Sequence, residues 1–261
     1  MNTILVSSHR RSGTHFLIDS LRKNIEGAHF PNHLFLPADF NLGSLFSKKQ
    51  KIYDVFIKFL DQPGPIIIKS HLLPEECNLG SPKDKYEELI QEIYAQSSKL
   101  YIHRNGKSVL VSLYKFLAPD CTFSEFIRQP NDHIVYEMRS EKSFDLDRVS
   151  YWAQHIREWQ AAPDVTQISF ENLLSNFNAD MNKILASLGH KGPIEVSKPL
   201  LPRYPILQGI QKKMSTFGVM NLPENSSVRP TKRSKQQGGD FFKDSLDALF
   251  FEEQSGALTI D

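Results

Sequence analysis

A short polar run near the start of the chain is the first segment that could do chemistry. The run Arg10–Thr14 reads Arg-Arg-Ser-Gly-Thr, follows the β-branched stretch 3–8 and comes directly before a segment with helical apolar spacing. A helix that begins here has unpaired backbone N–H groups and the positive end of its dipole facing the loop. Together with the arginines, the hydroxyls and the small glycine, these N–H groups could bind a phosphate. Ordinary helix capping uses the same residue types and is the competing interpretation.

A second cation stands at the end of another apolar stretch. Arg104 follows residues 99–103, and a helical pattern begins just after it. Ser112 lies about two turns into that pattern, on the face that Ser108 begins. An arginine at a strand end and a hydroxyl on the next helix could bind a second phosphate, although a lone arginine could equally pair with a surface carboxylate.

A third segment places a possible proton acceptor at a strand end. Three isoleucines, 66–68, are followed by Lys69 and then His71. The near-neutral pKa of histidine suits the removal of a proton from an acceptor group. A lone histidine is more often structural, but a neighbouring lysine and a nearby anion site favour the catalytic interpretation.

These three segments need a scaffold that brings their ends together. Short β-branched runs alternate with longer amphipathic runs, which favours an α/β fold with a central, mostly parallel sheet flanked by helices. Ligands of such sheets bind beyond the carboxyl ends of the strands, where all three segments are expected. The predicted strands are Thr3–Ser8, Pro65–Lys69, Lys99–His103 and Val165–Phe170. The predicted helices are Thr14–Asn24, Tyr53–Leu60, Lys83–Gln96, Lys107–Leu117, Arg148–Ala161, Glu171–Leu188 and Phe242–Glu253.

Length and composition set the remaining limits. The 261 residues are expected to form a single domain, 1–261, in which the irregular tract 191–237 is either a lid and cofactor-binding loop or a disordered surface segment. A net charge of +1 argues against a nucleic-acid partner. No apolar run is long enough to cross a membrane and no leader is recognisable, so the sequence predicts a cytoplasmic protein. Cys77 and Cys121 lack metal-ligand spacing, and no metal site is expected.

Taken together, the three segments resemble the cytosolic sulfotransferase superfamily, whose members transfer sulfuryl groups from 3′-phosphoadenosine-5′-phosphosulfate (PAPS). Arg11–Phe16 is similar to the family's 5′-phosphosulfate loop, Lys-Ser-Gly-Thr-Thr-Trp, and Lys69–Pro74 resembles its Lys-Thr-His-Leu-Pro strand end. Arg104 and Ser112 stand at the offsets of its 3′-phosphate motif. Two later segments, similar to its Tyr-Glu-Asp-Leu and Gly-Asp-Trp-Lys, are Ile168–Leu173 and Gly239–Lys243.

The resemblance implies a P-loop-like sulfotransferase architecture and a set of residue roles. It implies that catalysis depends on His71, Lys69 and Arg11. It implies that the nucleotide is bound by Arg10, Arg11, Ser12, Gly13, Thr14, His15, Phe16, Arg104, Ser112, Phe170, Arg233, Ser234 and Lys235. Arg11 replaces the family's usual catalytic lysine, Phe16 its adenine-stacking tryptophan and Phe170 a tyrosine. Because arginine does not easily donate a proton, the expected role of Arg11 is electrostatic.

The expected reaction is an in-line sulfuryl transfer that needs no metal. His71 would remove a proton from a hydroxyl or amine, while Arg11 and Lys69 would stabilise the charge that develops at the sulfuryl group. The expected acceptor is a small organic molecule, polar or cationic, such as a secondary metabolite. The loops expected to bind it, whose acidic residues could also be merely solvated, are 30–46, 118–141 and 199–224. The sequence leaves the oligomeric state open.

Two other function classes compete with this interpretation. A P-loop kinase would use Ser12 and Thr14 at a magnesium site, but its loop would need a Gly-Lys pair that is missing here. The run Gly106–Ser108 is not a Walker A loop either, because Tyr101 occupies the position of the first glycine. A non-catalytic nucleotide-binding module is the second alternative, and the Lys69–His71 pair argues against it.

Overall fold

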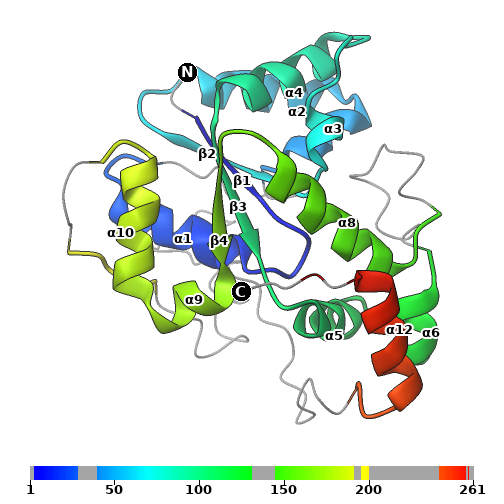
Figure 1. The fold of residues 1–261 in the computed structure, drawn as a ribbon. Helices are drawn as coiled ribbons and strands as arrows, with labels where there is room; N and C mark the ends of the chain where they lie inside the picture. The colour runs from blue at the N-terminus through cyan, green and yellow to red at the C-terminus, as the bar shows by residue number, and fades with distance from the viewer. Residues whose placement is uncertain are drawn as a thin grey trace, which may run out of the picture.

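The computed structural model describes residues 3–28, 40–130, 145–190, 195–199, 241–256 and 258. Their centre is a four-stranded sheet in the order β2-β1-β3-β4, with every pair of neighbouring strands parallel (Figure 1). The strands are β1 (Thr3–Ser7), β2 (Ile66–Ser70), β3 (Ser98–His103) and β4 (Val165–Ser169). Each lies within one residue of its predicted bounds, so the predicted α/β fold with a parallel sheet is confirmed.

Buried apolar side chains explain why these runs form inner strands. Leu5 and Val6 of β1 and Ile67 and Ile68 of β2 have no exposed surface. A strand that is apolar on both faces requires cover on both, which helices supply in a parallel sheet. The register pairs Ser7 with Ser70, so the loops that follow β1 and β2 leave the sheet side by side.

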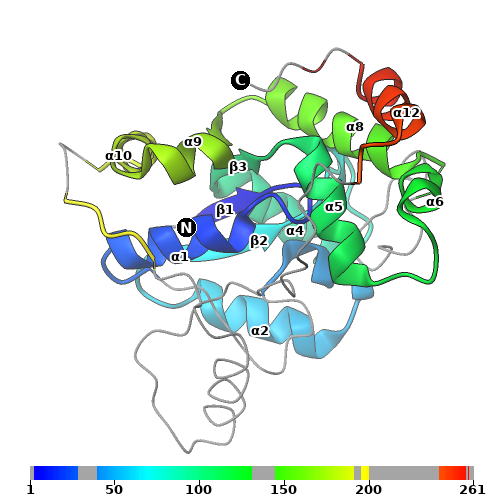
Figure 2. The ribbon, with the colours of Figure 1, turned by 90° about the horizontal axis from the view of Figure 1, so that it is seen from below.

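The longer helices surround the sheet. They are α1 (Thr14–Asn24), α2 (Gln50–Leu60), α4 (Lys85–Gln96), α5 (Gly106–Leu117), α8 (Arg148–Ala161), α10 (Phe177–Ser187) and α12 (Ser245–Ser255). In both views α10 lies at one side of the molecule, and α8 and α12 lie together at the other (Figures 1 and 2). Among the described residues, no helix is long and apolar enough to cross a membrane.

Four local features differ from the prediction, the first being that α2 begins at Gln50, three residues before the predicted start at Tyr53. The single helix predicted over 171–188 is wrong, because the chain forms α9 (Phe170–Ser175) and α10, separated by Asn176 in a non-helical conformation (φ −121°, ψ 42°). The apolar spacing continues across this break and therefore hides it. The helix predicted over 242–253 begins three residues later, after Asp244, whose carboxylate accepts a hydrogen bond from the Leu246 N–H. Short helices that the sequence did not predict are η1 (Leu42–Ser47), α3 (Pro74–Cys77) and α6 (Phe123–Arg128).

Candidate active site

The loop between β1 and α1 has the backbone of an anion site. Arg11 and Gly13 both have positive φ, 68° and 99°, on either side of Ser12. Alternating backbone handedness of this kind turns successive N–H groups toward one point. Helix α1 begins after Gly13, which has no side chain to accept a hydrogen bond from the first N–H groups of the helix. The Ser12 hydroxyl is buried and has no hydrogen-bond partner among the described residues. The loop thus offers donors that ordinary capping leaves unused.

Gly13 is required here by space as well as by conformation. A Cβ at this position would lie 2.2 Å from Cδ2 of Phe170, the first residue of α9. The Phe170 ring meets the edge of the Phe16 ring, with centroids 6.0 Å apart, and Phe16 itself is buried. The Phe170 ring therefore packs against the loop, and Phe16 packs against that ring. Thr14, at the start of α1, shares a hydrogen bond of 2.5 Å with the Ser8 hydroxyl.

Arg11 is held by helix α5. Its Nε–H donates to Ser112 Oγ at 3.1 Å, and its guanidinium carbon lies 4.6 Å from the centre of the Phe116 ring. Arg104, at the end of β3, donates from Nη1 to the Arg11 carbonyl at 3.4 Å. The structure therefore brings the first and second predicted segments into contact, although Arg11 and Ser112 are 101 residues apart in the sequence.

Both interpretations of Arg104 have support in the structure. Its Nε lies 3.9 Å from Glu171 Oε1, so a carboxylate partner exists. That carboxylate is 47% exposed, and an exposed pair of this kind is weak. The guanidinium of Arg104 also lies 4.8 Å above the Phe170 ring, and burial lowers its pKa. Arg104 is thus a partly buried cation directly beside the loop.

His71 is held in the tautomer that a general base needs. It follows β2, and its Nδ1 lies 2.8 Å from the Ser8 carbonyl oxygen. Because a carbonyl can only accept, Nδ1 carries the proton and the lone pair is on Nε2. Burial, followed by the positive charges of Lys69 and Arg10, lowers the pKa of His71 well below 6.5. The ring is therefore neutral at neutral pH and able to accept a proton.

Lys69 reaches the same edge of the sheet. It lies on β2 opposite Val6 and is only 6% exposed. After burial, its positive charge is a cause of the lowered pKa of His71. A buried cation next to a neutral base is an arrangement suited to a negatively charged substrate.

A buried polar cluster behind His71 was not predicted from the sequence. His155 of α8 bonds through Nε2 to the His71 carbonyl oxygen at 3.3 Å and through Nδ1 to the Tyr101 hydroxyl at 2.9 Å. Trp159, one turn further along α8, donates from Nε1 to the Leu72 carbonyl oxygen at 3.0 Å. The sequence signal was present, since a histidine on the apolar face of a helix and a tyrosine in the middle of a buried strand both need partners.

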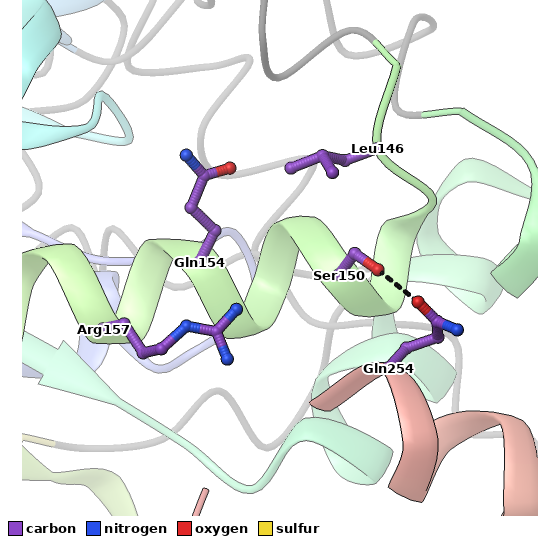
Figure 3. Close-up of a pocket in the computed structure, with 5 residues that line it drawn as sticks. All are labelled: Leu146, Ser150, Gln154, Arg157 and Gln254. Carbon is purple, nitrogen blue, oxygen red and sulfur yellow. Dashed lines mark hydrogen bonds between the residues drawn. The ribbon is translucent and has the colours of Figure 1, made fainter. Parts of the chain in front are cut away.

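The remaining predicted site residues are placed only in part. Arg10 and His15 are half-buried residues of the loop and of the first turn of α1. Arg233, Ser234 and Lys235 lie outside the described residues. A surface pocket on α8 and α12 contains no predicted site residue (Figure 3), and its lining residues are Leu146, Ser150, Gln154, Arg157 and Gln254.

Fold and site together define an α/β domain with a cationic, glycine-containing loop after its first strand and a neutral histidine after the neighbouring strand. Residues 2–249 match the family model described as "Sulfotransferase domain", and the chain belongs to this family. The resemblance found in the sequence is thereby confirmed.

Curated relatives and a solved structure are consistent with this assignment. The chain is 25% identical over 198 residues to sulfotransferase 1A1 of Mus musculus and 26% identical over 204 residues to sulfotransferase 1A1 of Rattus norvegicus. Each match covers 74% of this chain and 61% of the relative, so the chain spans less than two thirds of these proteins. The crystal structure of mouse sulfotransferase SULT7A1 complexed with PAP has a similar fold, with a TM-score of 0.56 at 17% identity over 97% of this chain and 82% of that one.

Proposed function

We propose that the protein transfers a sulfuryl group from PAPS to the hydroxyl or amine of a small organic acceptor. The observation that carries this proposal is the neutral His71, with its lone pair on Nε2. It follows β2, the neighbour of β1, and β1 leads into loop 8–13, which we call the anion loop. Family membership supports it, as does the PAP that the similar mouse sulfotransferase binds.

The residues present fit a nucleotide that carries phosphate groups. Ser12 has a buried hydroxyl without a partner among the described residues, and the space beside Gly13 is too small for any side chain. Arg11 and Arg104 supply two cations at the loop, and Arg104 donates a hydrogen bond to the main-chain carbonyl of Arg11. When bound, PAPS would supply an electrophilic sulfur whose bond to the 5′-phosphate oxygen breaks as the acceptor attacks.

Three residues of this chain would then act on the reacting atoms. His71 accepts the acceptor's proton at Nε2. Lys69 and Arg11 place positive charge where negative charge develops, which is the largest contribution in many group transfers. Arg11 does not donate a proton, because its guanidinium stays protonated at any accessible pH.

The sequence also suggests an acceptor class and a cellular location. We propose a polar or cationic small molecule, such as a secondary metabolite, in a cytoplasmic protein whose segment 191–237 covers the donor. Most of the loops expected to bind the acceptor lie outside the described residues. Phe116 of α5 is 43% exposed and lies against the Arg11 guanidinium, so it offers an aromatic surface beside the proposed site.

A binding titration and one variant test the proposal. The purified protein should bind PAPS and PAP but not Mg-ATP, and it should sulfate at least one member of a panel of phenols, alcohols, sugars and amines. His71→Ala should lower turnover about 10²–10⁴-fold while the Kd for PAP is unchanged. His190→Ala, three residues after the end of α10, is the matched control and should keep full activity. Binding of Mg-ATP with magnesium-dependent transfer would instead identify a kinase, and full activity of His71→Ala would refute the assignment of the base.

A further inference from the structure

We propose that His155 and Tyr101 are positioning residues that fix His71, through its main chain, in the orientation needed for proton removal. This inference rests on the proposed function but concerns residues that lie behind the site. Both side chains are completely buried, and neither was among the predicted site residues.

The hydrogen bonds from Tyr101 to His71 run in one direction. The His71 carbonyl can only accept, so Nε2 of His155 must carry the proton and donate it. Nδ1 of His155 must then accept, which makes the Tyr101 hydroxyl the donor at 2.9 Å. The ring of His9, in the anion loop, meets the edge of the His155 ring, with centroids 5.7 Å apart. One buried connection therefore joins the anion loop, β3, α8 and the main chain of the base.

Burial keeps this connection in a single protonation state. It lowers the pKa of His155 well below 6.5 and raises the pKa of Tyr101 well above 10.0. Neither group changes its charge around neutral pH, so the directions of both hydrogen bonds are constant while the enzyme works.

His71 is thus held at two independent points. Helix α8 holds its carbonyl through His155, and the end of β1 holds its ring through the Ser8 carbonyl. Trp159 holds the next carbonyl, that of Leu72, from the same face of α8. With the main chain and Nδ1 both fixed, the direction of the lone pair on Nε2 is determined. A side chain misplaced by about 1 Å can cost about 100-fold in rate, so such fixation has a measurable effect.

The polar side chain at position 155 does more than fill space. A phenylalanine there would fill a similar volume but would leave the His71 carbonyl and the Tyr101 hydroxyl without these hydrogen bonds. The two hydrogen bonds of His155 therefore contribute orientation as well as stability.

Four variants separate positioning from folding. His155→Phe removes both hydrogen bonds, whereas His155→Gln keeps a donor for the His71 carbonyl and an acceptor for the Tyr101 hydroxyl. Tyr101→Phe removes the proton that sets the His155 tautomer. The matched control is Ser97→Ala, which removes a buried hydrogen bond of 2.8 Å to Thr3 at the opposite end of the sheet.

Three measurements on each variant decide the question: kcat, the Kd for PAP, and the tautomer of His71 from imidazole ¹⁵N shifts. We expect His155→Phe to lower kcat about 10–100-fold at unchanged PAP affinity and to mix the His71 tautomers. His155→Gln should stay within about three-fold of wild type, and Ser97→Ala should lose stability but not kcat. If His155→Phe does not fold, Tyr101→Phe tests the same connection and should lower kcat several-fold.

Two results would overturn the inference. One is a folded His155→Phe with wild-type kcat and an unchanged His71 tautomer. The other is an equal loss of kcat in His155→Phe and His155→Gln, which would mean that volume rather than hydrogen bonding matters. If the wild type binds PAP but sulfates nothing, the proposed function fails, and the ¹⁵N shifts still decide the positioning role.

Discussion

Replacing Gly13 by alanine should damage the anion loop in two separable ways. The backbone there has φ +99°, a conformation that costs an L-residue about 1–2 kcal/mol. The added Cβ would also lie 2.2 Å and 2.7 Å from two carbons of the Phe170 ring, so the ring must move. That ring packs against Phe16 and under Arg104, and displacing it should cost a further amount of about 1–3 kcal/mol. We expect a total loss of about 2–5 kcal/mol.

Urea unfolding of matched variants measures both parts. Gly189→Ala has a similar backbone, φ +87°, and no described atom within 4 Å of the added Cβ, so it measures the cost of the conformation alone. In a Phe170→Ala background the steric part should vanish, which gives a coupling of at least about 1 kcal/mol in the double-mutant cycle. Gly13→Ala should also weaken PAP binding, because the donors of the loop shift. A loss no greater than that of Gly189→Ala, with additive effects of Phe170→Ala, would refute the reasoning.

Three further predictions concern charge and protonation. Burial lowers the pKa of His9 from 6.5 to about 4, so the unfolded chain binds a proton at this position before the folded chain does, and the free energy of unfolding falls below pH 6.5. At pH 5 this loss should be about 2 kcal/mol for His9 alone. His9→Gln should therefore flatten the pH dependence of urea unfolding. In an NMR titration of the ligand-free protein, His71 should titrate well below 6.5 and move upward in Lys69→Met, and an unmoved midpoint would contradict the proximity of the two groups. Glu171→Gln removes a carboxylate 3.9 Å from Arg104 and should tighten PAP binding about two- to five-fold in calorimetry, more at low salt, whereas weaker binding would show that Glu171 supports the site.

The sheet could be predicted because its signal is local. A buried parallel strand is a short run of β-branched residues, and Ile66–Ile68 is such a run. The break at Asn176 could not be predicted, since one amphipathic pattern covers both α9 and α10. The start of α12 was missed for a related reason, because Phe242 fits the apolar spacing but lies before the helix.

The candidate site divides in the same way. Arg11 and His71 were identified because each belongs to a compact segment at a strand end. The contact of Arg11 with Ser112 and that of His155 with His71 join residues 101 and 84 positions apart, and only the folded chain defines them. A pattern within one segment shows which residues need partners, but it does not show which partners they find.

Arg11 combines charge with an unfavourable backbone. Its φ of 68° is a conformation that glycine adopts without cost and that other residues adopt only when the surrounding structure enforces it. A glycine at position 11 would relieve that strain but remove the guanidinium, so variants selected for heat resistance alone would tend to lose the cation. The loop is thus a point of conflict between thermal stability and the proposed anion site, and stabilising the protein while keeping that cation requires changes elsewhere in the chain.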